Sequence, residues 1–220
     1  MSNTKKCDKK LNFFEYDIPN DVFHNINNEE VIGIDTEALG LNIRRDRLCL
    51  VQICVYGKEQ QCKCYVVHFP ESKYEKSKNL IKLFRNKKIK KIFHFARFDM
   101  SIIQQYLKVL PTNIICTKIM SKLSRTFTER HGLKELCREL LGVELNKTSG
   151  CSYWGGVLTQ QQQQYAINDV VYLKDLSEKL KSILIKEKRW KLAELAFKAL
   201  EMVVTMDLSG FDPVYIINHH

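Results

Sequence analysis

The sequence is poor in residues that break or link domains, and it has no long apolar run. Of its 220 residues only 4 are proline and 9 are glycine, and no Pro/Gly-rich linker interrupts the chain. No apolar run approaches the roughly 18 residues that a membrane span needs. We therefore expect no membrane association and one domain over residues 1–220, with a core at about 20–186 and a C-terminal helix and tail at 187–220.

The cysteines lack the spacing of a metal or redox motif. There are 8 of them, and no pair is separated by two residues. Cys62 and Cys64 are too close for a zinc knuckle and have no matching second pair. Because several cysteines lie in apolar runs and no signal peptide is present, we interpret them as reduced, small hydrophobic residues of a cytoplasmic protein.

The chain does have an excess of positive charge. Its 35 Lys and Arg exceed its 25 Asp and Glu, which gives a net charge of +10 and a pI near 9.1. Such an excess favours a polyanionic partner such as nucleic acid. A lysine-rich but merely solvated surface explains the charge equally well, so the motifs must decide between the two.

The order of the apolar segments predicts an α/β protein with a mixed sheet of about five strands flanked by helices. A short buried strand is expected at 31–34, a hairpin at 48–56 and 64–69, and two more strands at 92–95 and 113–116. Helices are expected around 80–84, from Asp99 to Pro111, at 132–141, at 159–186 and at 189–204. The apolar tail at 210–220 is expected to pack against something, and it and the last helix are where we expect subunit contacts.

Carboxylates recur in three short motifs. Asp35 and Glu37 end the first predicted strand and share one face, because alternate strand residues point the same way. Asp99 lies at the start of a predicted helix, and Tyr165 and Asp169 share a helix face at a spacing of four residues. Taken singly, these motifs are as well or better explained by turn capping, helix capping and a boundary position beside the core.

Together the motifs favour a two-metal site. An α/β sheet brings such segments to the cleft at its strand ends. Like charges held together need a cation, and oxygen ligands favour Mg²⁺ or Mn²⁺. Four carboxylates can hold two ions, one activating a water and one stabilising the leaving oxygen of a phosphodiester. Because a phenol is protonated at neutral pH, Tyr165 is assigned to orienting the attacking water.

These motifs resemble those of the DEDD 3′–5′ exonucleases, in the tyrosine-bearing subclass. The histidine subclass carries His where this chain has Gln164. The surroundings of Tyr165 and Asp169 are similar to ribonuclease D. Longer matches, at 34–41, 45–49, 92–95, 116–119 and 130–135, resemble the short nanoRNase C-type oligoribonucleases. Tyr153 departs from that family, which usually has Asp there.

The resemblance implies an RNase H-like exonuclease fold and removal of nucleotides from RNA 3′ ends. It also implies a preference for very short RNA, dinucleotides included, and a ring-like homo-octamer. It assigns the metals to Asp35, Glu37, Asp99 and Asp169. Candidate substrate contacts are Thr36, Leu39 as a wedge between the last two bases, His94, Phe98, and the cations Arg125, Arg130 and Lys147.

Each of these contacts has a simpler explanation. Leu39 and His94 can be ordinary core residues, and the cations can be solvated charges. Two other functions also stay open. One is a longer-substrate enzyme, either a ribonuclease D-like trimmer of tRNA 3′ ends or a DNA 3′–5′ exonuclease. The other is a non-catalytic nucleic-acid-binding module.

Overall fold

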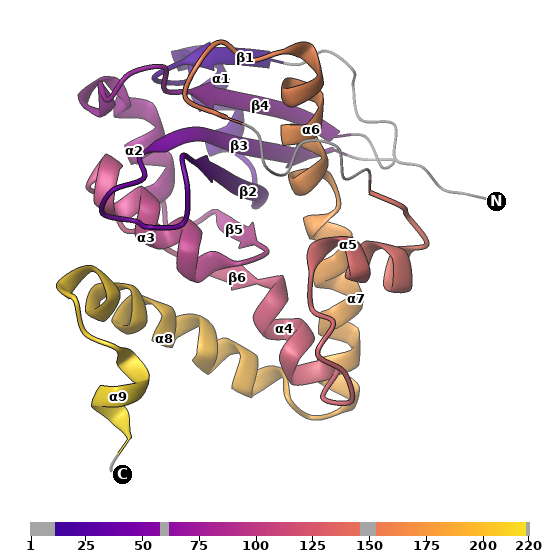
Figure 1. Ribbon diagram of the computed structural model, residues 1–220. Coiled ribbons are helices and arrows are strands. Elements are labelled where there is room, and N and C mark those ends of the chain that lie inside the picture. The colour runs from indigo at the N-terminus through magenta and orange to yellow at the C-terminus, as the bar shows by residue number, and fades with distance from the viewer. Residues whose placement is uncertain (1–11, 58–61, 146–152, 219–220) are drawn as a thin grey trace.

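A computed structural model describes residues 12–57, 62–145 and 153–218 of the chain. Its centre is a six-stranded mixed sheet in the order β1-β4-β3-β2-β5-β6 (Figure 1). The strands are β1 (Asn12–Glu15), β2 (Val31–Ala38), β3 (Leu48–Tyr56), β4 (Cys62–His68), β5 (Lys90–Phe93) and β6 (Ile114–Cys116). The predicted α/β class and mixed sheet are confirmed.

The sheet has one strand more than the five expected. β2, β3 and β4 are antiparallel neighbours, whereas β5 and β6 run parallel to β2. The additional strand, β1, pairs parallel with β4 at the edge of the sheet. Its four residues are too few to show a pattern that predicts a strand. Their extended conformation depends on the pairing with β4.

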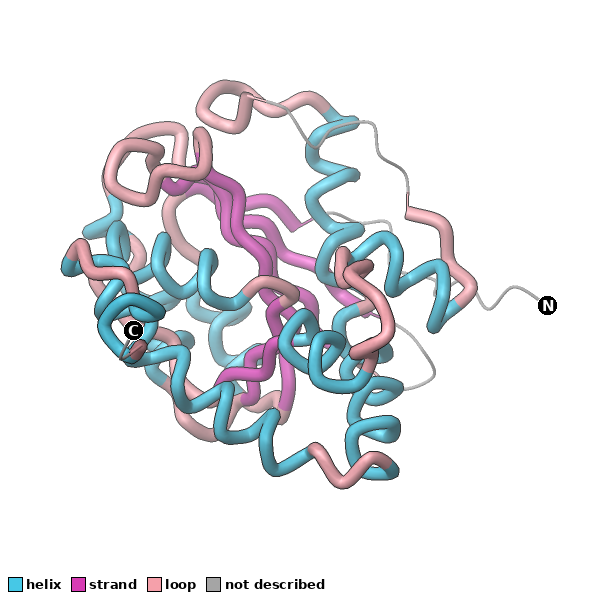
Figure 2. The backbone as a smooth tube through the Cα atoms, turned by 60° about the horizontal axis from the view of Figure 1, so that its bottom comes forward, coloured by secondary structure: helices cyan, strands magenta, loops and turns pink. Residues whose placement is uncertain are grey.

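Helices cover both faces of the sheet (Figure 2). One face packs on α1 (Asn20–Asn27), the short η1 (Tyr74–Lys76), α2 (Lys78–Arg85) and α3 (Ala96–Leu107). The other face packs on α6 (Gln160–Val171), whose apolar residues join those of β3 and β4 in a second core cluster. Side chains on both faces of the sheet are therefore buried, as in sheets that helices cover on both sides.

The remaining helices form a third apolar cluster beside the sheet. They are α4 (Thr117–Ser124), α5 (Leu133–Leu136) with the π-helical η2 (Cys137–Leu141), α7 (Leu173–Lys186) and α8 (Trp190–Ser209). Gly142 ends η2 in the left-handed conformation (φ 67°), which glycine adopts readily at the end of a helix. No helix among the described residues has the length and apolarity to cross a membrane.

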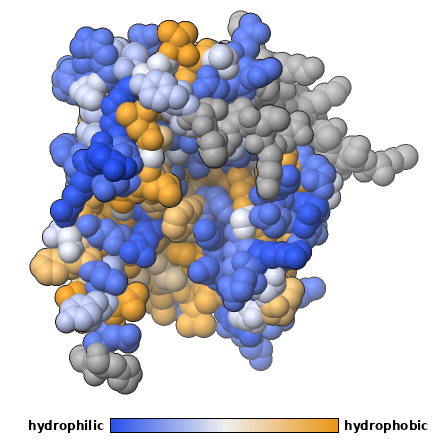
Figure 3. Space-filling view, in the orientation of Figure 1, coloured by the Kyte–Doolittle hydropathy of each residue, from blue (hydrophilic) through white to orange (hydrophobic). Residues whose placement is uncertain are grey.

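Two expectations about the helices are wrong. The helix expected at 159–186 is two helices, separated at Tyr172 (φ −97°, ψ 0°). α3 ends at Leu107 and not at Pro111, because Lys108 takes the left-handed conformation (φ 54°). The tail forms α9 (Pro213–Ile217), which lies at the outer end of the molecule (Figures 1 and 3); Pro213 is buried, and the apolar side chains from Val214 to Ile217 are exposed within the single chain.

A glycine in β2 sets how closely α6 approaches the sheet. A Cβ on Gly33 would lie 2.0 Å from the Tyr56 hydroxyl and 3.0 Å from the Val170 carbonyl oxygen. That hydroxyl donates a hydrogen bond of 2.6 Å to the same carbonyl. The missing side chain therefore allows Tyr56 on β3 to hold α6 against the centre of the sheet.

We expect Gly33→Ala to destabilise the protein by about 1–3 kcal/mol, since it overpacks this contact. Tyr56→Phe should cost only about 1 kcal/mol through the lost hydrogen bond. The double variant should be more stable than the sum of the two single effects predicts, because removing the hydroxyl makes room for the Cβ. Chemical denaturation of the four proteins measures this coupling, and strictly additive free energies would contradict it.

Candidate active site

Three carboxylates from two elements meet at one point on the α6 face of the sheet. Oxygens of Asp35 and Glu37 on β2 and of Asp169 on α6 all lie within 4.8 Å of one another. Asp35 and Glu37 share a face because they are alternate residues of one strand. Tyr56 and Gly33 hold α6 close by, since Val170, the partner of Tyr56, directly follows Asp169.

The fourth carboxylate, Asp99, comes from the first turn of α3 and is almost fully buried, with 3% exposure. Its Oδ1 accepts a hydrogen bond of 2.7 Å from the hydroxyl of Thr36. Thr36 lies between Asp35 and Glu37 and points to the opposite face. The predicted substrate contact Thr36 thus fixes Asp99 relative to β2.

Burial and mutual repulsion raise the pKa values of these carboxyl groups. For Asp35 the pKa is well above its ordinary value through burial, followed by the charges of Asp99, Asp169 and Glu37. Burial, with the charges of Asp169 and Asp99, raises the pKa of Glu37 to about 8. Burial also raises the pKa of Asp99 to about 7 and that of Asp169 to about 6. The group is costly to ionise without a cation.

The donor set fits hard divalent cations. All the converging ligand atoms are carboxylate oxygens, which are preferred by Mg²⁺ and Mn²⁺. A divalent ion would restore the ionised state that repulsion opposes. Asp35, Glu37 and Asp169 would hold it. Asp99, on α3, lies near them because Thr36 of β2 binds it.

Tyr165 lies on the face of α6 that carries Asp169, as the four-residue spacing predicted. Its ring stacks on Trp154, with ring centroids 6.2 Å apart. α6 begins with a capping box in which Thr159 and Gln162 exchange hydrogen bonds, so the first turn is firmly defined. Tyr165 is therefore held from both the helix and the neighbouring loop.

Leu39 lies just beyond the carboxylates and is 41% exposed, so it is not an ordinary core residue. Its side chain lies against the loop that contains Gly155. Such a half-exposed apolar side chain beside the carboxylates is compatible with the wedge expected from the resemblance. Phe98, in the first turn of α3, is partly buried and packs against the core.

His94 follows β5 and has one ring nitrogen bonded and one not. Nδ1 lies 2.9 Å from the Thr117 hydroxyl, and Nε2 is buried without a hydrogen-bond partner among the described residues. Burial lowers the pKa of His94 to about 4, so the ring is neutral.

The predicted cationic contacts differ in their surroundings. Arg125 is buried, pairs with Glu139 and donates a hydrogen bond of 2.9 Å to the Arg130 carbonyl. Its guanidinium therefore serves the packing of α4 against η2. Arg130 itself is exposed, and Lys147 lies outside the described residues.

One polar residue of the site did not emerge from the sequence. Gln52 on β3 is fully buried and lies opposite Asp35 in the strand pairing, and neither of its amide atoms has a hydrogen-bond partner among the residues that the structure describes. Directly opposed residues of an antiparallel pair share a face. The available signal was a single amide in the otherwise apolar or aromatic run Leu48–Tyr56.

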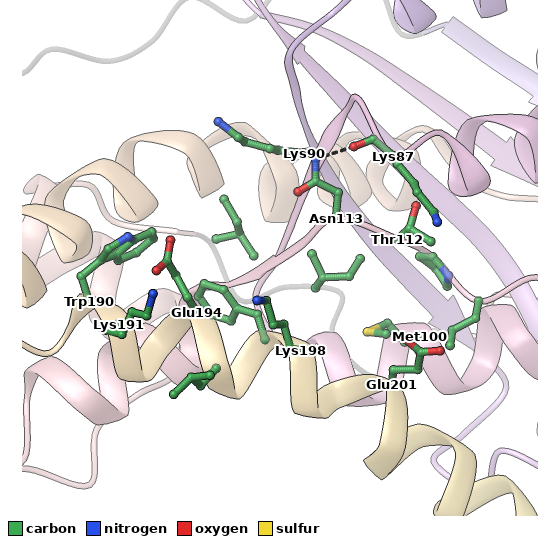
Figure 4. A pocket seen from close by; sticks show the side chains of 16 residues that line it. Lys87, Lys90, Met100, Thr112, Asn113, Trp190, Lys191, Glu194, Lys198 and Glu201 are labelled. Carbon is green, nitrogen blue, oxygen red and sulfur yellow. Dashed lines mark hydrogen bonds between the residues drawn. The ribbon is translucent and has the colours of Figure 1, made fainter.

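A cavity of about 910 Å³ between α8 and the β6 edge contains none of the predicted site residues (Figure 4). Its walls carry Lys87, Lys90, Lys191 and Lys198 together with Glu194 and Glu201. Asn113 closes one side through a 2.9 Å hydrogen bond to the Lys87 carbonyl. The charges in this wall have both signs, and the carboxylate group stands apart from it.

Residues 12–185 match the sequence profile of a 3′–5′ exonuclease family. The chain belongs to this family. It is 30% identical over 168 residues to ribonuclease D of Jannaschia sp. (strain CCS1), which covers 75% of this chain and 43% of that protein. It is 32% identical over 160 residues to DNA polymerase I of Aquifex aeolicus, covering 72% of this chain and 25% of the polymerase. The chain thus spans less than half the length of these relatives.

Solved structures agree with the exonuclease assignment. The structure of Brucella melitensis NrnC bound to pGG superposes with a TM-score of 0.85 at 41% identity, covering 96% of this chain and 99% of that one. NrnC with bound Mg²⁺ gives 0.85 at 40% identity, with 96% and 100% coverage. Escherichia coli RNase D shares the fold, with a TM-score of 0.71 at 21% identity over 84% of this chain and 47% of its own. The chain is thus a ribonuclease D-like exonuclease that resembles NrnC along nearly its whole length.

The raised carboxyl pKa values predict a pH-dependent stability without metal. Between pH 6.5 and 8 the folded state still holds protons on Asp99 and Glu37, with pKa values of about 7 and 8, that the unfolded state has released. Stability should therefore fall as pH rises through this window. Thermal unfolding in a chelator should show a lower Tm at pH 8 than at pH 6.5, and excess Mg²⁺ should reduce the difference.

Two buried bases oppose this trend mostly outside the window. His94, with a pKa of about 4, makes stability rise with pH only below about pH 6.5, and Lys91, with a pKa of about 8, does so mainly above pH 8. Glu37→Gln should flatten the slope, and Asp21→Asn, an exposed carboxylate on α1, should not. A metal-free Tm that stays level or rises from pH 6.5 to 8 would contradict the prediction.

Proposed function

We propose that this protein is a Mg²⁺- or Mn²⁺-dependent 3′–5′ exoribonuclease that degrades short RNA, dinucleotides included, to mononucleotides. The observation that supports it best is the convergence of Asp35, Glu37 and Asp169, with Asp99 held beside them by Thr36. Structural similarity to NrnC over nearly the full chain, in one case bound to pGG, supports the short substrate.

The chain's own residues would divide the work as follows. The four carboxylates would hold two divalent ions, and bound ions would supply a water of lowered pKa and neutralise charge on the leaving oxygen. Tyr165 donates its hydroxyl proton in a hydrogen bond that orients the attacking water. Leu39 separates the terminal base from its neighbour, and His94 lies close enough to Asp99 in the chain to contribute to the binding of the terminal sugar or phosphate.

Self-association into a ring, as the resemblance suggested, is part of the same proposal. The described residues of α9 carry exposed apolar side chains, with Val214 at 63%, Tyr215 at 77% and Ile217 at 55%. α8 adds Leu192 and Leu195, each 53% exposed. Exposed apolar side chains of this kind are typical of subunit contacts.

Asp35→Asn and Asp169→Asn should each lower kcat by on the order of 10³-fold, because each removes a charge that holds cations at the reacting phosphate. Tyr165→Phe should lower kcat by about 10²-fold, since only orientation is lost. Release of mononucleotides from a labelled dinucleotide in saturating Mg²⁺ measures both. Asp21→Asn serves as the matched surface control, and near-normal turnover by Asp35→Asn would refute the site.

A competition assay tests the substrate separately from the chemistry. A labelled RNA dinucleotide should be cleaved with a kcat/KM at least about tenfold above that of a long RNA or a DNA duplex, each supplied as competitor. Preference for a tRNA 3′ end would establish a trimming enzyme, and preference for DNA would establish a DNA exonuclease. Failure to release mononucleotides with either metal would support a binding module.

A further inference from the structure

Three cysteine thiols converge on the sheet face that α6 covers. The Sγ atoms of Cys54 on β3 and of Cys62 and Cys64 on β4 all lie within 4.8 Å of one another. Cys54 pairs directly with Cys64 across the two strands, and Cys62 is the next residue on the same face of β4. All three are buried, at 0%, 3% and 2% exposure.

We propose that Cys54, Cys62 and Cys64 form a three-thiolate binding site for a soft cation of low coordination number, with Cu(I) as the fitting ion. A metal bound to three sulfurs at about 2.3 Å in one plane separates those sulfurs by about 4.0 Å. The three sulfurs already lie within 4.8 Å of one another, close to that spacing.

The number of ligands selects the class of ion. Thiolate sulfur selects Cu(I) and Zn²⁺ over hard cations. Structural zinc sites take four protein ligands, whereas Cu(I) is satisfied by fewer sulfurs, and three thiols converge here. A three-coordinate soft ion such as Cu(I) is satisfied by the three thiolates that converge here.

Charge and chemistry are consistent with this site. Each coordinating thiol releases its proton to solvent and donates a sulfur electron pair to the ion, so nothing is oxidised or reduced. The resulting negative charge would lie near Lys174 of α7, whose ammonium is 5.9 Å from the ring centroid of Tyr56. Tyr56 is the strand partner of Cys62.

The site also has a structural link to the carboxylates. Tyr56 donates its hydroxyl hydrogen bond to the carbonyl of Val170, the residue after Asp169. The cysteines and α6 belong to the same apolar cluster. The proposal does not depend on the nuclease function, because binding at the cysteines can be measured on its own.

The test is an anaerobic titration of the reduced full-length protein with Cu(I) against a coloured Cu(I) chelator. Cys54→Val, Cys62→Val and Cys64→Val should each lower the affinity for one equivalent of Cu(I) by more than about 100-fold, since a direct ligand is lost. Cys49→Val and Cys137→Val are the matched controls, since both cysteines are buried but lie outside the group. Both controls should bind as the wild type does.

Circular dichroism and thermal unfolding establish that each variant is folded. A valine variant that does not fold is replaced by the serine variant at the same position. Equal binding by wild type and the three variants would overturn the proposal, as would an equal loss in the Cys49→Val control. Tighter binding of Zn²⁺ than of Cu(I) at the same cysteines would overturn the assigned class of ion. A Cys54–Cys64 disulfide that persists in reductant, seen by mass spectrometry, would overturn the site itself.

Discussion

Repulsion among buried carboxylates is the interaction on which the rest of the site depends. Asp35, Glu37 and Asp169 would separate if their backbones were free, because ionising them together in a partly buried place is unfavourable. The backbones are not free. β2 is bonded on both sides within the sheet, and α6 is held to that sheet by Tyr56. The fold thus stores an electrostatic cost that a divalent cation can remove.

The apolar layers on both sides of the sheet contribute enough folding free energy to offset this electrostatic cost. Every residue of β3 except Val55 is buried, and the two clusters that cover the sheet contain most of its large apolar side chains. Burial of this kind contributes about 25 cal/mol per Å² of apolar surface, so a few raised carboxyl pKa values remain a small fraction of the total. The site lies at the end of β2, where a bulge between Glu37 and Ala38 interrupts the pairing with β3.

The parts of the site that depend on local spacing could be predicted from the sequence. Strand alternation put Asp35 and Glu37 on one face, and the helical repeat put Tyr165 with Asp169. The parts that depend on contacts between distant segments could not be predicted. Thr36 meeting Asp99, Gln52 lying opposite Asp35, and Cys54 completing a group with Cys62 and Cys64 all follow from strand pairing and helix placement. β1 and the break at Tyr172 escaped for the same reason, since tertiary contacts override weak local preference.

The net charge of the chain and the charge of the proposed reaction centre have opposite signs. A net charge of +10 attracts a polyanion at long range. The proposed reaction centre carries the opposite sign, so a phosphate that reaches the carboxylates meets repulsion until cations are bound there. Arg125 cannot relieve it, because its guanidinium is already paired with Glu139 inside the protein. On the proposed mechanism the divalent ions are therefore needed to hold the scissile phosphate as well as to cleave it, and metal and substrate should bind with positive coupling.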